Sequence, residues 1–173
     1  MAVLLRTKDE LFPVLASFYA LGASRHGYLV HRATRGDSAS DRASLEAAGL
    51  DVGALEAQHQ LAIVEFDPDE PAETSPQAWQ DVLERSLAGG YSALWYSRFA
   101  VGPGDVEYRN VIPLERAWGQ HFAGSPVVTL CPYIVGALDG TEALRRLTDV
   151  AGLHAGVLVA SDDGLALMRP ATS

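Results

Sequence analysis

The chain has 173 residues, 48% of them hydrophobic and 20% charged, which is typical of a folded globular protein. Its length suits one domain over residues 1–173, and its net charge of −9 argues against nucleic acid or a membrane surface as a partner. The single cysteine excludes an intramolecular disulfide, and no apolar stretch approaches the roughly 20 residues of a membrane-spanning helix. We therefore expect a cytoplasmic protein.

The first half of the chain alternates between short apolar runs and amphipathic segments. Thr7 and Glu10 have the spacing of a capping box, and the apolar residues that follow recur on one side of a helix. Ser38 and Asp51 stand where two further helices are expected to begin. The strands expected in this half are residues 2–5, 27–32 and 61–66.

The second half continues this alternation. Pro76 fits the first turn of a helix that Gly89 and Gly90 end, and a strand is expected over residues 91–99. Pro113 is expected to start the next helix. The predicted buried face of that helix consists of Leu114, Ala117, Trp118, His121 and Phe122.

The last part of the chain completes the fold prediction. A strand over residues 127–130 precedes a helix that Asp139 and Glu142 cap, and a hairpin is expected over residues 155–168. Because strands alternate with helices throughout, we predict a three-layer α/β/α sandwich. Its sheet is expected to be mostly parallel, with an antiparallel C-terminal edge.

Cys131 follows the apolar run at residues 127–130 and precedes Pro132. Such a run predicts a strand buried on both faces of a parallel sheet, and ligands of open α/β sheets bind outside the carboxyl ends of the strands. The sequence therefore predicts that Cys131 lies at this rim. There it would line a pocket, act as a nucleophile or pack as a small apolar residue.

Other polar residues are predicted to face the same rim. His31 ends the predicted strand at residues 27–32, and Tyr96 and Arg98 end the following one, where Arg98 could hold an anion or pair with a carboxylate. Of the remaining histidines, His121 is interpreted as packed, and His59 and His154 as surface or capping residues. The sequence leaves open whether His154 has a function.

No cofactor is expected. A phosphate-binding loop requires clustered amides and a lysine, whereas the first strand–helix junction reads Arg6-Thr7-Lys8-Asp9-Glu10, with two carboxylates and no glycine. No GxGxxG motif follows a strand. No two of the five histidines have the close spacing of a metal site such as HExxH. We therefore expect neither a nucleotide nor a metal.

Several segments together resemble a known family. They are the segment LEAAGLDVGALEAQHQLAIVEF, the segment LAGGYSALWYSRFA, the helix ERAWGQHF running into VVTLCPY, and a late histidine before VLVASDDGLAL. This order is similar to the MEDS domain, the methanogen/methylotroph DcmR sensory domain. The resemblance implies a RecA/KaiC-type core without a functional phosphate loop. By motif position, Cys131 and Tyr133 match the family's Cys-x-Tyr strand end, and His154 matches its late histidine.

The resemblance also implies a function. Domains of this family are associated with sensing hydrocarbon-type compounds in transcription regulation, usually beside a DNA-binding or kinase module. Here MAVLLR lacks the histidine and the terminal aromatic residue that the family's first strand often carries, and no output module is present in the sequence. We therefore expect signalling through a separate regulatory protein or through a change in homo-oligomeric assembly.

The leading hypothesis is a stand-alone, non-catalytic sensory domain that binds a small, largely apolar molecule at the C-terminal rim of its sheet. Its predicted ligand contacts are His31, Tyr96, Arg98, Cys131 and Tyr133. One alternative is a cysteine-dependent enzyme in which Cys131 is the nucleophile and His31 the base. The other is a protein-interaction regulator without a ligand, which would expose an aromatic patch made of Trp95, Tyr96 and Phe99.

Overall fold

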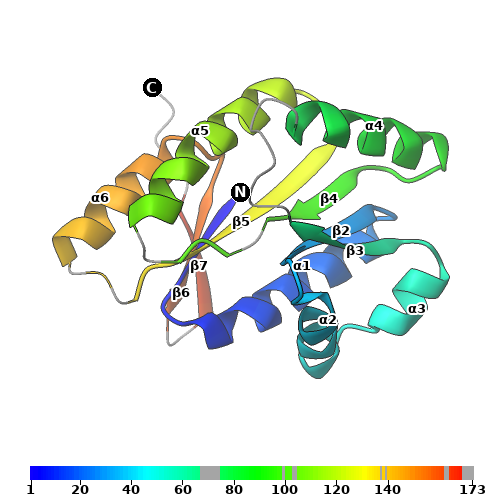
Figure 1. The fold of residues 1–173 in the computed structure, drawn as a ribbon, viewed down its shortest axis with the longest axis horizontal. Helices are drawn as coiled ribbons and strands as arrows, with labels where there is room; N and C mark the ends of the chain where they lie inside the picture. Colours follow the sequence, from blue (N-terminus) through cyan, green and yellow to red (C-terminus); the bar gives the residue numbers. More distant parts are fainter. Residues whose placement is uncertain are drawn as a thin grey trace.

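One central sheet organises the structure, a computed structural model that describes residues 1–66, 75–98, 100–102, 105–136, 138, 140–161 and 164–168. The sheet has seven strands in the order β3-β2-β4-β5-β1-β6-β7 (Figure 1). Strands β1 to β6 are parallel, and β7 is antiparallel to β6. The strand bounds are β1 (Ala2–Leu5), β2 (Tyr28–Thr34), β3 (Leu61–Phe66), β4 (Leu94–Ser97), β5 (Val127–Ile134), β6 (Val157–Ser161) and β7 (Gly164–Met168).

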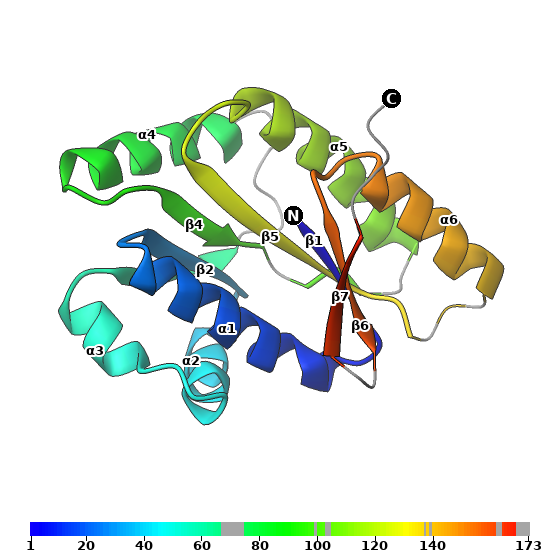
Figure 2. The same ribbon diagram turned by 180° about the vertical axis from the view of Figure 1, so that it is seen from behind.

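Helices cover both faces of this sheet, so the predicted three-layer α/β/α sandwich with an antiparallel edge is confirmed (Figures 1 and 2). A 3-10 turn, η1 (Lys8–Glu10), leads from β1 into the first helix. The helices of one face are α1 (Leu11–Ser24), α2 (Ser38–Ala47) and α3 (Val52–Ala57). Those of the other face are α4 (Ser75–Ala88), α5 (Asp105–His121) and α6 (Gly140–Ala151).

The strand register decides which side chains meet which helices. Successive residues of a strand point to opposite faces, so residues paired across neighbouring strands share a face. Ala2 pairs with Cys131, and Tyr96 pairs with Thr129. Residues of this set pack with Tyr108, Trp118 and Phe122 of the α5 region. The alternate residues, such as Val3, Leu29, Trp95 and Leu130, form a separate core with α1 to α3.

Two strands extend beyond their predicted ends. β2 continues to Thr34, so His31 lies inside the strand, and β5 continues through Cys131 and Pro132 to Ile134. Pro132 is tolerated because its side of β5 faces β4, which ends at Ser97, so the missing amide removes no ladder hydrogen bond. The prediction that Cys131 ends its strand is therefore wrong.

Helix α5 also differs from its prediction. It begins at Asp105, so Pro113 lies inside it rather than at its start. The buried positions of the helical turns are Tyr108, Val111, Glu115, Trp118 and, just after the helix, Phe122. This 3-4-3-4 spacing turns His121 to the exposed side, so its interpretation as a packed residue is wrong. A charged residue, Glu115, takes a buried place instead.

Among the described residues, none belongs to a helix that is both long and apolar enough to cross a membrane.

Candidate functional site

The five predicted ligand contacts divide between the two faces of the sheet. Tyr96, Cys131 and Tyr133 belong to the residues that pack against α4 to α6, and Arg98 joins them through its contact with Glu115 of α5. His31 instead pairs in register with Ser97, on the face covered by α1 to α3. The structure therefore places four of the five residues on one face of the sheet and the fifth, His31, on the other.

His31 is held in a hydrogen-bonded network of its own. Its Nδ1 lies 3.1 Å from the hydroxyl of Tyr19 and 3.2 Å from that of Ser97, and its Nε2 lies 2.9 Å from Asp41 Oδ2. Both ring nitrogens therefore have partners. Because the sheet lies between His31 and Cys131, His31 is not placed to act as a base for that thiol.

Glu115 forms the centre of the polar cluster on the α5 side. Its Oε1 accepts a hydrogen bond from Arg98 Nη1 at 3.1 Å, and both side chains are buried. Its Oε2 accepts from Cys131 Sγ at 3.1 Å and lies 3.8 Å from His154 Nε2. The carboxylate thus joins residues of β4, β5 and the segment between α6 and β6.

Burial sets the protonation states in this cluster. It raises the pKa of the Cys131 thiol well above its usual value, and the charge of Glu115 raises it further. Burial lowers the pKa of His154 to about 4, although Glu115 opposes this shift. For Arg98, burial acts to lower the pKa, but the attraction of Glu115 outweighs it. At neutral pH the cluster therefore holds a neutral thiol and a neutral imidazole beside the Arg98–Glu115 salt bridge.

A cavity of about 160 Å³ adjoins this cluster. Three of its lining residues, Met1, Val127 and Ala155, stand at or just before the amino ends of β1, β5 and β6. The cavity therefore lies at the opposite end of the strands from the predicted C-terminal rim, because Cys131 pairs with Ala2 at the start of β1. Its full lining is Met1, Glu115, Trp118, Gly119, Phe122, Val127, Thr129, Cys131, Leu153, His154 and Ala155.

The two predicted tyrosine contacts do not line this cavity. The Tyr96 ring stacks on Trp118 at 4.6 Å, and its hydroxyl accepts a hydrogen bond from Arg32. The Tyr133 hydroxyl is buried with no hydrogen-bond partner among the described residues, and it adjoins a void too narrow for water, which Leu4 and Val150 also line. Tyr96 therefore packs against Trp118, which lines the cavity, and Tyr133 lines a different, smaller void.

The structure also bears on the predicted aromatic patch. Trp95 is 9% exposed and Tyr96 is fully buried, and the two point to opposite faces of the sheet. Phe99 lies outside the described residues. Trp95 and Tyr96 form no exposed docking surface, because helices cover both faces at β4, so that form of the interaction-module hypothesis is wrong.

A second cavity, of about 250 Å³, lies at the carboxyl ends of the strands. None of the five predicted contacts lines it, although Asp41, the hydrogen-bond partner of His31, and Arg32, the hydrogen-bond partner of Tyr96, do. Its remaining lining residues are Lys8, Leu11, Phe12, Thr34, Asp37, Ala100, Gly102 and Ile134. A cavity is thus present at the end of the strands where ligands of open sheets typically bind, but its lining differs from the predicted one.

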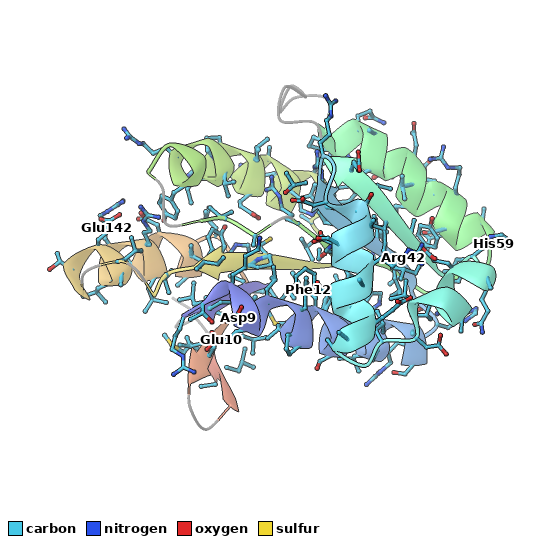
Figure 3. All side chains as sticks on the ribbon, turned by 60° about the horizontal axis from the view of Figure 1, so that its bottom comes forward. Asp9, Glu10, Phe12, Arg42, His59 and Glu142 are labelled. Carbon is cyan, nitrogen blue, oxygen red and sulfur yellow. The ribbon has the colours of Figure 1, made fainter. Side chains whose placement is uncertain are left out.

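The junction between β1 and α1 shows why no phosphate loop forms at this rim. Glu10 lies at the start of α1 beside Asp9 (Figure 3), and its carboxylate accepts hydrogen bonds from the Arg6 amide at 2.7 Å and Arg6 Nε at 2.8 Å. Although desolvation acts to raise the Glu10 pKa, these bonds and one from the Thr7 amide lower it. A carboxylate of the chain thus accepts from amides of this junction. Thr7 makes no side-chain cap, so the predicted capping box is not formed.

Two residues of the cluster, Glu115 and His154, are not among the site residues predicted from the sequence. Glu115 follows Tyr108 and Val111 in a helical 3-4 spacing, and a carboxylate within an otherwise apolar stripe is a detectable signal. That signal was hidden because the helix was expected to begin at Pro113. His154 was interpreted as a surface or capping residue, yet its side chain is only 7% exposed.

The sheet order and the two helical layers define an α/β protein of RecA/KaiC-like architecture. A KaiC-like protein from the archaeon Pyrococcus horikoshii OT3 superimposes with a TM-score of 0.61 at 16% identity, over 96% of this chain and 75% of that one. An uncharacterised protein from Pyrococcus horikoshii, solved with an unknown peptide, gives a TM-score of 0.55 at 16% identity, over 97% and 82% of the two chains. At such identities the likeness concerns the fold alone.

The family follows from the sequence comparison. A family model described as the MEthanogen/methylotroph, DcmR Sensory domain, MEDS, matches residues 1–155. The chain belongs to this family of sensory domains, as the sequence resemblance indicated. Among curated proteins, none matches the chain significantly.

Proposed function

We propose that this domain is a non-catalytic sensor that binds a small, largely apolar molecule in the 160 Å³ cavity beneath α5. The observation that carries the proposal is the composition of the cavity wall. Trp118, Phe122 and Leu153 supply apolar surface. The polar groups of Glu115, Cys131 and His154, which also line the cavity, lie within 4.8 Å of one another. Small-molecule sites typically combine such surfaces with a few convergent polar groups.

The volume limits the size of the ligand. A dry engineered cavity of about 150 Å³ holds one benzene molecule, so a ligand of a few heavy atoms fits here. Membership in a family of sensory domains supports a regulatory role. The protonation states support a role without catalysis, because a buried neutral thiol is a poor nucleophile.

Helix α5 is the element through which the bound state would reach a partner protein. It supplies Glu115, Trp118 and Gly119 to the cavity wall, and Arg116 on the same helix is exposed. A ligand that fills the cavity would press on the inner side of α5 and shift its outer side. The separate signalling protein of this proposal would read that shift.

The proposal is tested by a thermal-shift screen with benzene, toluene and small halogenated alkanes, on protein treated with a chelator. A ligand at 100 times its dissociation constant stabilises by about 2.7 kcal/mol, which raises the Tm by several degrees in a chain of this size. Gly119→Leu should abolish this rise in Tm. Gly119 lines the cavity, and a Cβ there has no neighbour within 4 Å, so the added side chain has room to occupy the space that the ligand needs.

Gly53→Leu is the matched control. It makes the same change in helix α3, where a Cβ also has no neighbour within 4 Å, and Gly53 does not line the cavity. This variant should show the same ligand-induced rise in Tm as the wild type. A screen in which no compound raises the Tm, or in which Gly119→Leu responds like the wild type, would refute the proposal.

A further inference from the structure

Three side chains of the polar cluster have the chemistry and spacing of metal ligands. The ligand atoms of Glu115, Cys131 and His154 all lie within 4.8 Å of one another. A tetrahedral zinc site with bonds of about 2.0–2.3 Å places its ligand atoms about 3.3–3.8 Å apart. The observed 3.1 Å from Cys131 Sγ to Glu115 Oε2 and 3.8 Å from His154 Nε2 to the same oxygen are close to that geometry.

The imidazole of His154 supplies an independent indication of a ligand. Its side chain is 7% exposed, and its Nε2 is buried without a hydrogen-bond partner among the described residues. A buried nitrogen without a partner is costly in a folded protein. Because His154 lines the cavity together with Glu115 and Cys131, a bound ion would satisfy this nitrogen.

We propose that Glu115, Cys131 and His154 bind one transition-metal ion, with zinc as the best match. A thiolate, an imidazole and a carboxylate together favour Zn²⁺ over Mg²⁺ or Ca²⁺, which prefer oxygen ligands. Three protein ligands would leave the fourth position open, and all three residues line the cavity.

Binding rearranges one proton and one hydrogen bond. The Cys131 thiol releases its proton to solvent as the sulfur–metal bond forms, and Glu115 Oε2 exchanges the S–H hydrogen bond for the ion. Arg98 remains on Glu115 Oε1 and orients the carboxylate from behind, as second-shell partners of metal ligands do. The dication offsets the two buried negative charges that result.

Sequence spacing does not reveal this site, because each ligand comes from a different element. Glu115 belongs to α5, Cys131 to β5, and His154 to the segment between α6 and β6. Close spacing, as in HExxH, arises when two ligands belong to the same helix or turn. The inference does not depend on the apolar ligand of the proposed function, because an ion can bind whether or not the rest of the cavity is filled.

The test is a titration of the reduced, metal-free protein with Co²⁺, followed by competition with Zn²⁺ and without any organic compound. We expect one ion per chain and a thiolate-to-cobalt charge-transfer band that Zn²⁺ removes. Cys131→Ser should abolish the band, and His154→Gln should weaken binding at least about 10-fold. His121→Gln, at an exposed position of α5, should leave both unchanged.

Circular dichroism without metal establishes that each variant is folded, and His154→Gln decides the question if Cys131→Ser does not fold. Wild-type protein that binds Co²⁺ without a charge-transfer band, or that binds none, would overturn the inference. So would equal affinity in wild type and His154→Gln. Because the screen for apolar ligands is carried out with chelator, a failure of the metal site and a failure of the proposed sensor are distinguishable.

Discussion

Glu115 is the residue on which the polar cluster depends. It is 4% exposed, and each of its carboxylate oxygens has a partner, Arg98 for one and Cys131 for the other. A buried ion pair often contributes little net stability, but removing one partner leaves the other charge buried without compensation. The charge of Glu115 therefore contributes to stability mainly by balancing the buried charge of Arg98.

Glu115→Gln should cost about 3–5 kcal/mol in free energy of unfolding, since it removes one charge of a buried ion pair. Urea denaturation followed by circular dichroism measures this loss. The control is Glu56→Gln, which removes a partly exposed partner of Arg42 and should cost at most about 1 kcal/mol. Similar losses in the two variants would show that the Arg98–Glu115 pair is solvated rather than buried.

The sequence identified part of this cluster. Cys131 and Arg98 were predicted as site residues, and both lie in it, because chemistry-bearing side chains on buried strands are recognisable in the sequence. Glu115 and His154 were not, because their approach to Cys131 depends on the packing of α5 and of the segment before β6. His31 was grouped with them wrongly, since a difference of one position along a strand moves a side chain to the other face.

At the scale of elements, the contact between the ends of β1 and β5 fixes the carboxyl rim. Gly136 follows β5 and packs on the backbone of Arg6, which follows β1. A Cβ at Gly136 would lie 2.0 Å from the Arg6 carbonyl oxygen. Backbone atoms cannot move aside as a flexible side chain can, so the two segments would have to separate.

Gly136→Ala should therefore destabilise the protein by about 1–3 kcal/mol, the usual range for overpacking. Gly53→Ala is the matched control, because a Cβ there meets nothing within 4 Å, and alanine in a helix is favoured over glycine by about 1 kcal/mol. Urea midpoints of the two variants should move in opposite directions. A shift of the same sign in both would contradict the close approach of Gly136 to Arg6.

The order of elements was more predictable than their ends. Apolar periodicity and caps such as Asp51, which accepts from the Ala54 amide, identified helices and strands correctly. Proline misled the boundaries twice, because Pro132 lies inside β5 and Pro113 inside α5. Local rules treat proline as a boundary because it removes a backbone donor, whereas here both prolines lie inside longer elements.

At the scale of the molecule, the sheet separates two different interiors. The α1–α3 side holds one continuous apolar core that includes Leu15, Leu29 and Trp95. The α4–α6 side has two smaller apolar clusters, and the polar cluster and its cavity lie on this side. The 160 Å³ cavity thus lies on the side whose apolar packing is divided into two clusters, whereas the 250 Å³ cavity lies at the carboxyl ends of the strands, beside α1 and α2.

Buried tyrosines on both sides make the whole fold sensitive to alkaline pH. Burial raises the pKa of Tyr19 and of Tyr96, and it raises that of Tyr108 to about 12, with nearby Asp149 adding to this effect. In the unfolded chain these hydroxyls ionise near pH 10. Between about pH 10 and 12 the unfolded state thus binds fewer protons than the folded one, and stability falls as the pH rises.

The measurement combines Tm values from pH 8 to 12 with the phenolate absorbance of the native protein. We expect the Tm to be steady below about pH 10 and to fall above it, with phenolate absorbance from these three tyrosines appearing only as the protein unfolds. Tyr108→Phe should make the fall in Tm less steep, because it removes one group whose ionisation favours unfolding. Complete ionisation of all tyrosines near pH 10 in protein that is still folded would contradict the burial of Tyr19 and Tyr96 beneath the two helical layers.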